Sequence, residues 1–107
     1  MALLYFDNFD IGSTFRAGPV EMTAEEIVAF ASRFDPQPFH TDEVAAEHTF
    51  FKGLAASGWH TAAVTMQMLV QALPVADGLI GAGLDELRWP QPTRPGDVLR
   101  VVCEVLE

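Results

Sequence analysis

Gly58 to Leu73, with the sequence GWHTAAVTMQMLVQAL, is the stretch that decides the fold of this chain. Its apolar residues fall on nearly every side of a helix and comprise Trp59, Ala62, Ala63, Val64, Met66, Met68, Leu69, Val70, Ala72 and Leu73. A helix that is hydrophobic all round is a buried helix, so we expect the rest of the chain to wrap it. The stretch is shorter than the roughly 20 apolar residues that span a bilayer, and it therefore predicts a core helix and no membrane partner.

The sequence TAEE at residues 23–26 has the pattern of a capping box, which marks the start of another helix. The hydroxyl of Thr23 can accept a hydrogen bond from the amide of Glu26, while the Glu26 side chain reaches back to the Thr23 amide. We expect this helix to continue to about Arg33.

Two prolines stiffen the loop that follows, DPQPFH at residues 35–40. Each proline lacks an amide donor and pushes the residue before it out of the helical region, so the preceding helix must end here. The loop brings together a carboxylate, Asp35, and an imidazole, His40. Thr41 is then predicted to cap a short helix over residues 42–46.

The remaining segments are predicted to be strands and turns. The expected strands are residues 14–16 and 19–22, broken at Gly18-Pro19, then residues 79–89, and finally the β-branched residues 98–106. This order predicts an α+β domain whose antiparallel sheet packs one face on the helix at 58–73. The chain contains no internal repeat or linker, so residues 1–107 are expected to form a single domain.

Composition narrows the classes of function. The formal net charge of −9 at pH 7 argues against sequence-independent nucleic-acid binding, which needs Lys and Arg to displace counterions from phosphates. Cys103 is the only cysteine, which excludes an intrachain disulfide, and residues 1–6 lack the basic start of a signal peptide. We therefore expect a cytoplasmic protein of a size at which oligomerisation often helps stability.

Asp35 and His40 are the candidate catalytic residues. A carboxylate and an imidazole held this way can share one substrate water, with one group accepting its proton and the other orienting the water or protonating the product. In the alternative interpretation Asp35 only caps the preceding helix or a turn, and His40 is an ordinary hydrogen-bonded loop histidine. Their spacing alone leaves both interpretations open.

Ser57 and Gly58, at the start of the long helix, are candidates for substrate binding. A helix start offers unpaired amides and the positive end of a dipole, which suit a carbonyl oxygen that gains negative charge. Ser57 has equally the side chain of an ordinary helix N-cap, and the two roles are compatible. Met66 would contact an acyl chain lying along the helix, although a methionine here is also typical of helix packing.

The three histidines do not predict a metal site. His40, His48 and His60 are separated by eight and twelve residues, which matches no tight ligand pattern, and no cysteine supports them. The chain also lacks a Gly-rich phosphate loop and a serine nucleophile elbow. We therefore predict neither a metal nor a cofactor.

The sequence resembles the MaoC-like dehydratases, the (R)-specific enoyl-CoA hydratase group, over residues 11–107. The residues similar to their hydratase motif are Phe30-Ala31, Asp35-Pro36-Gln37-Pro38-Phe39-His40-Thr41-Asp42, Ala45, Phe51, Leu54-Ala55 and Gly58, with a similar Pro95-Gly96-Asp97 turn before the last strand. The resemblance implies a hot-dog fold, in which a curved antiparallel sheet wraps one long helix, and a dimer with substrate between the protomers.

The same resemblance implies hydration of a trans-2-enoyl-CoA to an (R)-3-hydroxyacyl-CoA, or the reverse dehydration, in fatty acid metabolism. Asp35 and His40 would bind and activate the water, and the amide of Gly58 would hold the thioester carbonyl. The acyl-CoA is then the substrate, and no separate cofactor is implied.

The chain departs from the family pattern in two side chains and in length. Ser57 stands where many relatives have His, and Met66 where some have a polar residue. Family members continue for further strands beyond Glu107, so the sheet is expected to lack its last strands. We expect a homodimer or larger assembly to compensate, unless these residues are part of a longer natural chain.

Two other functions stay open. A hot-dog acyl-CoA thioesterase would usually carry a carboxylate on the long helix, and residues 58–73 contain none. A non-catalytic acyl-CoA-binding or structural subunit would keep the fold and lack a complete site.

Overall fold

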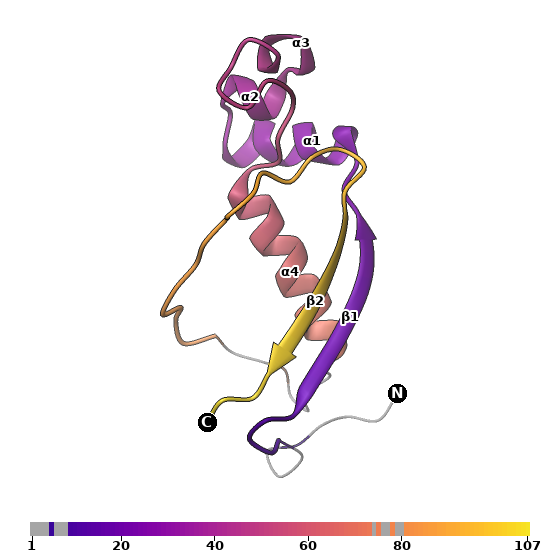
Figure 1. Ribbon diagram of the computed structural model, residues 1–107, viewed down its shortest axis with the longest axis vertical. Coiled ribbons are helices and arrows are strands. Elements are labelled where there is room, and N and C mark those ends of the chain that lie inside the picture. The colour runs from indigo at the N-terminus through magenta and orange to yellow at the C-terminus, as the bar shows by residue number, and fades with distance from the viewer. Residues whose placement is uncertain (1–4, 6–8, 74, 76–77, 79–80) are drawn as a thin grey trace.

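The computed structural model describes Tyr5, residues 9–73, Val75, Gly78 and residues 81–107. In chain order its elements are β1 (Thr14–Glu21), α1 (Ala24–Phe34), α2 (Pro38–Thr41), α3 (Glu43–Ala46), α4 (Gly58–Ala72) and β2 (Val98–Glu104). Figure 1 shows the three shorter helices gathered at one end of α4, with the sheet alongside it. The radius of gyration is 16.2 Å, against about 13 Å for a compact domain of this length. The molecule is therefore elongated.

β1 and β2 form a two-stranded antiparallel sheet in which Thr14 pairs with Glu104 and Glu21 with Val98. The predicted break at Gly18-Pro19 is wrong, because β1 continues through it and only the register shifts there. Gly18 has a φ of 107°, and a Cβ on it would lie 2.9 Å from a backbone oxygen of β2. Glycine allows this close approach of the two strands.

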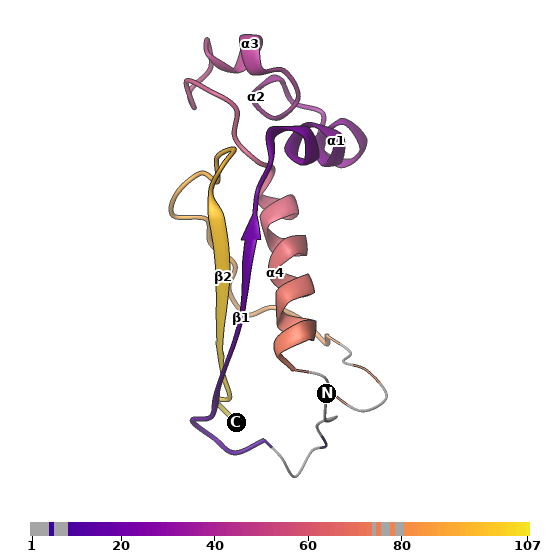
Figure 2. The same ribbon diagram turned by 90° about the vertical axis from the view of Figure 1, so that its right-hand side faces the viewer.

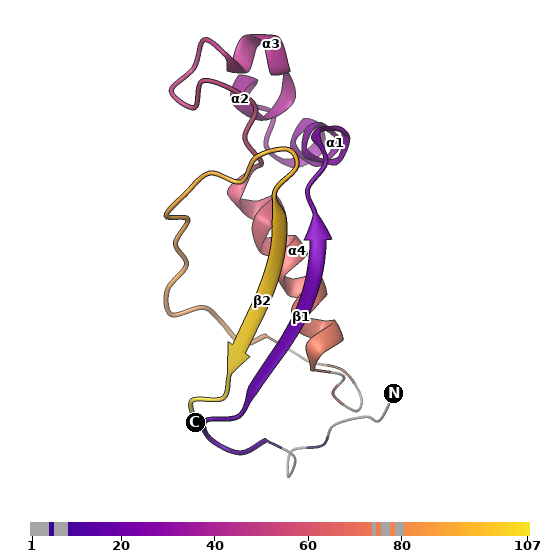
Figure 3. The same cartoon turned by 45° about the vertical axis from the view of Figure 1, so that its right-hand side comes forward.

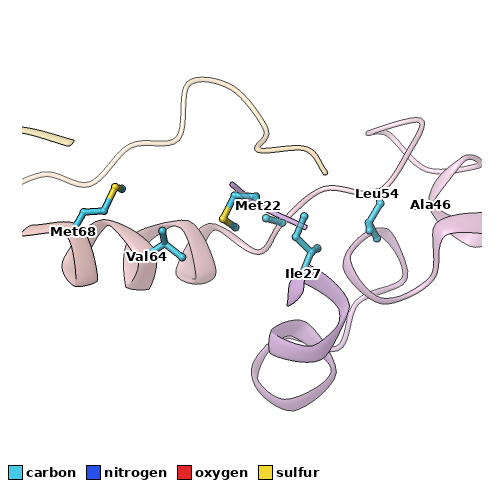
Figure 4. Close-up of a cluster of buried hydrophobic side chains, with 7 residues drawn as sticks. Met22, Ile27, Ala46, Leu54, Val64 and Met68 are labelled. Atoms are coloured by element: carbon cyan, nitrogen blue, oxygen red, sulfur yellow. The ribbon is translucent and has the colours of Figure 1, made fainter. Parts of the chain in front are cut away.

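α4 packs against both strands through one face, as Figure 2 shows. Its buried side chains are His60, Val64 and Met68, which follow one another at helical spacing. The hydrophobic core continues from this face toward α1 and α3, as Figure 4 shows, and consists of Met22, Ile27, Ala46, Leu54, Ala56, Val64 and Met68. The core thus joins the sheet side of α4 to the helical end of the molecule.

The other face of α4 is not covered by the described part of the chain. Trp59, Met66 and Val70 are 60%, 49% and 50% exposed. The sequence predicted a helix wrapped on every side, whereas β1 and β2 cover a single face. No helix in the described ranges is long and apolar enough to cross a membrane.

The signals at the helix ends are largely confirmed. The hydroxyl of Thr23 accepts a hydrogen bond from the amide of Glu26 at 3.2 Å, and α1 ends at Phe34, directly before Asp35-Pro36. The predicted cap at Thr41 is wrong, because Thr41 ends α2. Asp42 caps α3 instead, since its carboxylate accepts the amides of the two residues that follow Glu43 at 2.9 and 3.1 Å.

The strand predicted over residues 79–89 is wrong for its described part, residues 81–89, and residues 79–80 lie outside the described ranges. Residues 81–92 make no backbone hydrogen bond to any described residue. Their apolar side chains also do not alternate, so neither a ladder nor one buried face holds them as a strand. Figure 3 shows the orange segment that leads into β2 running beside the sheet.

Candidate active site

Asp35 follows directly on α1 and begins the proline loop. Its backbone amide still donates to Ala31 of α1 at 2.8 Å, while the residue itself has left the helical conformation because Pro36 follows. The side chain is half-buried and points at the loop that precedes α4. The end of α1 thus fixes the position of the Asp35 backbone, from which the carboxylate extends.

His40 belongs to the single turn of α2, which Pro38 opens from the first helical position. Its side chain is 5% exposed, and Nδ1 lies 2.6 Å from the carbonyl oxygen of Ala55. A carbonyl oxygen only accepts hydrogen bonds, so Nδ1 carries the proton and donates it. In neutral His40, Nε2 is therefore a free acceptor.

Nε2 of His40 lies 3.4 Å from Oδ2 of Asp35. The carboxylate also accepts a short hydrogen bond from Nε2 of Gln37 on Oδ1 and one of 2.8 Å from the hydroxyl of Ser57 on Oδ2. Burial by itself raises the pKa of Asp35, but the donors Gln37 and Ser57 and the charge of protonated His40 outweigh it and lower that pKa. Asp35 is consequently a carboxylate at neutral pH.

The start of α4 lies beside this pair. Ser57 makes no side-chain capping bond, because its hydroxyl is directed at Asp35, so the ordinary N-cap interpretation is wrong. The amides of Gly58 and Trp59 are donated to no carbonyl of the described residues. The indole of Trp89 covers Gly58 closely, and a Cβ there would lie 2.7 Å from the ring. The start of α4 thus combines two amides that bond to no described carbonyl with the ring of Trp89 packed over Gly58.

The carboxylate–imidazole pair and the start of α4 from Gly58 line one cavity of about 400 Å³, whereas Ser57 lies behind Asp35 and is not in the lining. Its lining consists of Asp35, His40, Phe50, Phe51, Ala56, Gly58, Trp59, Thr61, Trp89, Pro90, Gln91, Pro92 and Thr93. Asp35 and His40 are the ionisable residues in that lining, and the remaining wall is mostly aromatic or apolar. A small acyl group and a single water could meet the carboxylate–imidazole pair there.

Comparison with known proteins assigns the chain to a family. The family model described as "MaoC like domain" matches residues 8–107. The chain belongs to the MaoC-like domain family.

Two solved structures and a sequence relative support this assignment. The MaoC-like dehydratase from Rhodospirillum rubrum is 55% identical with a TM-score of 0.91, over 97% of this chain and 71% of that one. The R-hydratase PhaJ1 from Pseudomonas aeruginosa, in its unliganded form, is 28% identical with a TM-score of 0.73, over 94% of this chain and 64% of that one. The uncharacterized protein YdeM of Bacillus subtilis (strain 168) is 32% identical over 94% of this chain and 72% of its own length. The predicted hot-dog fold is therefore confirmed.

The predicted substrate-binding residue Met66 and the histidine His60, both on α4 of this MaoC-like domain, are not part of the cavity lining. Met66 is on the exposed face of α4 and does not line the cavity, so its contact with an acyl chain stays a prediction. His60 is buried and stacks on Phe30 with ring centroids 4.7 Å apart. No three potential metal-ligating side chains gather at one point within the described ranges.

Sequence reasoning missed two residues that shape the site. Gln37 holds one oxygen of Asp35, and a polar residue between two prolines was the available signal. The guanidinium of Arg94 donates to the carbonyls of Phe51, Gly53 and Leu54 at 2.6, 3.0 and 3.2 Å. Its place before Pro95-Gly96-Asp97 gave no sign of partners 40 residues away. Arg94 therefore links residues 51–54 to the segment that leads into β2.

Proposed function

We propose that this MaoC-like domain is a hydratase or dehydratase of acyl thioesters, which adds water to a trans-2-enoyl-CoA to give an (R)-3-hydroxyacyl-CoA or catalyses the reverse reaction. The observation that carries the proposal is the 3.4 Å approach of Asp35 Oδ2 to His40 Nε2 in the wall of a cavity that also includes Gly58. The names of two structural relatives, a MaoC-like dehydratase and an R-hydratase, support the reaction class.

The protonation states suit the capture of a water molecule. Both Oδ2 of Asp35 and Nε2 of neutral His40 are acceptors, so the two repel unless a donor lies between them or His40 is protonated. A water can donate one hydrogen to each, which leaves a lone pair on its oxygen for attack on C3 of the enoyl group. One of the two groups then accepts the water proton as the new C–O bond forms.

The electrons displaced from the C2–C3 double bond move onto the thioester oxygen as an enolate. The amide of Gly58, which bonds to no carbonyl of the described residues and lies at the positive end of the α4 dipole, is the proposed seat of that oxygen. As the enolate collapses, C2 takes the proton held by the Asp35–His40 pair, and the pair returns to its starting state. Water and proton come from the same pair, so both add to one face of the double bond.

The test is an absorbance assay with crotonyl-CoA and longer trans-2-enoyl-CoA substrates. We expect enzyme-dependent loss of the enoyl absorbance, with no release of free thiol. Thiol release without loss of the enoyl group would replace the proposal with a thioesterase. Binding of the thioesters without either change would identify a non-catalytic acyl-CoA-binding protein.

We also propose that the domain works as a homodimer or larger assembly. The apolar outer face of α4, with Met66 and Val70, supports association, as does the backbone of residues 81–92, which bonds to no backbone group of a described residue. Sedimentation equilibrium at low micromolar concentration should give a mass above that of the monomer, and Val70→Glu should lower it. A well-folded wild-type species at the monomer mass would contradict the assembly.

A further inference from the structure

Ser57 is fully buried at the junction between the proline loop and α4. A serine in this position ordinarily accepts an amide of the first helical turn with its side chain. Here the side chain makes no such capping bond, and the amide of His60 donates to the backbone carbonyl of Ser57 at 3.0 Å. The hydroxyl donates instead to Oδ2 of Asp35 at 2.8 Å.

The oxygen that Ser57 holds is the one that faces the imidazole. Oδ2 of Asp35 lies 3.4 Å from Nε2 of His40, whereas Oδ1 accepts the side-chain amide of Gln37. With a donor on each oxygen, the carboxylate cannot rotate about its own axis without losing a hydrogen bond. An ionised carboxylate has about four acceptor positions, so Oδ2 keeps room for a reacting water.

The same short segment also holds the other parts of the site. The carbonyl of Ala55 accepts Nδ1–H of His40 at 2.6 Å, and the amide of Gly58 donates to no carbonyl within the described ranges. The amide of Ala56 in turn donates to the carbonyl of Thr93 at 2.8 Å. Ala55 therefore anchors the imidazole, Ser57 anchors the carboxylate, and Gly58 carries the amide proposed for the thioester.

We propose that Ser57 is a positioning residue, whose hydroxyl holds Oδ2 of Asp35 in register with both His40 Nε2 and the Gly58 amide. The inference rests on the proposed hydration reaction. Because Ser57 and Gly58 are adjacent in the backbone, the hydroxyl fixes the distance from the proton acceptor to the seat of the thioester carbonyl. Ser57 acts through Asp35 and needs no contact with the substrate.

Removal of the hydroxyl should alter catalysis more than substrate binding. We expect Ser57→Ala to lower kcat about 10-fold to 100-fold, which is the usual effect of one hydrogen bond to a charged group, with KM changed by no more than about twofold. The acid limb of the kcat/KM profile should also move to higher pH. A carboxylate that keeps its burial and loses a donor is protonated more easily.

The test compares Ser57→Ala with Ser57→Thr, which restores a hydroxyl, and with Ser32→Ala, an exposed serine on α1. Each variant is measured for its pH–rate profile and for the pKa of Asp35 by NMR of carboxyl-labelled aspartate, with Asp35→Asn to assign the signal. We expect a raised pKa of Asp35 and a shifted acid limb in Ser57→Ala, recovery in Ser57→Thr and no change in Ser32→Ala.

An unchanged pKa of Asp35 together with an unshifted acid limb in Ser57→Ala would overturn the inference, even if kcat fell. Should Ser57→Ala fail to fold, Ser57→Gly also lacks the hydroxyl and is tolerated at a helix start, so it carries the same measurements. The NMR titration needs no turnover. If the wild-type protein hydrates no enoyl-CoA, the proposed function fails while the NMR result still decides whether Ser57 holds Asp35.

Discussion

Residues 54–57 and residues 81–92 are both irregular in backbone, yet they differ in burial and in hydrogen bonding. The first segment is buried, and its backbone groups form hydrogen bonds with α2, with the side chain of Arg94 and with the carbonyl of Thr93. The second is exposed throughout and makes no backbone hydrogen bond to a described residue. It contacts the site through Trp89, whose ring packs edge-on against Trp59 with the ring centroids 5.7 Å apart. Irregular backbone can position catalytic groups when neighbouring elements bind it.

The largest expected effect comes from the groups that the buried segment holds. Asp35→Asn and His40→Ala should each lower kcat by about 100-fold or more, because each removes an acid–base group. Asp85→Asn and His48→Ala are matched controls at exposed positions and should leave the rate unchanged. The measurement is enoyl-CoA hydration with circular dichroism as a check of folding. A variant of Asp35 or His40 with an unimpaired rate would remove that residue from the mechanism.

The anchoring of the buried segment can be broken at Arg94. Arg94→Ala removes the donors to Phe51, Gly53 and Leu54, and we expect it to lower the free energy of unfolding by roughly 2 kcal/mol. Arg88→Ala breaks an ion pair with Glu86 in which both side chains are exposed. It should change the free energy of unfolding by less than about 0.5 kcal/mol.

Urea unfolding of the two arginine variants gives the comparison directly. Arg94→Lys should restore only part of the stability, because an ammonium cannot reach three carbonyls with the fork of a guanidinium. Equal losses in the alanine variants at positions 94 and 88 would mean that Arg94 does not anchor the buried segment.

The contact of Trp89 with the start of α4 can be tested at Gly58. A methyl group there would lie 2.7 Å from the indole of Trp89, so Gly58→Ala should push the ring away and change tryptophan fluorescence. The free energy of unfolding should change by no more than about 1 kcal/mol, since alanine favours the helix while the ring loses its contact. Gly81→Ala has no atom within 4 Å of the added methyl and is the control. An unchanged spectrum for Gly58→Ala would show that Trp89 does not cover the start of α4.

The smallest expected effect is a pH dependence of stability from His60. Burial lowers the pKa of His60 from its usual 6.5, and the charge of Glu26 opposes this only in part. The unfolded chain therefore takes up this proton at a higher pH than the folded chain. Stability from this group is complete above about pH 6.5 and declines as the pH falls from there through the lower pKa of the folded state.

Urea midpoints measured from pH 8 to pH 5 check the decline. His60→Phe keeps a ring against Phe30 and should remove the decline in stability, whereas His48→Ala should leave the decline in place. Asp35 contributes in a separate window, because its lowered pKa places its loss of stability below its usual value of 3.8. A decline of the same size in His60→Phe would assign it to another group.

The sequence by itself determined the elements whose signals act over a few residues. The Thr23 cap and the end of α1 before Asp35-Pro36 could be predicted because caps and prolines act on the backbone beside them. The helix after Ser57 could be predicted from its own run of apolar residues. The candidate pair Asp35 and His40 was found for the same reason, since one stiff loop holds both. The family resemblance extended these local signals to the hot-dog fold.

Tertiary structure alone decided which groups those side chains meet. The hydroxyl of Ser57 reaches Asp35, 22 residues away, and the carbonyl that binds His40 is 15 residues away, distances over which no local rule acts. The predicted strand at 79–89 failed for a related reason. A helix satisfies its backbone within itself, whereas a strand exists only where a neighbour pairs with it, and residues 81–89 have no such neighbour among the described residues.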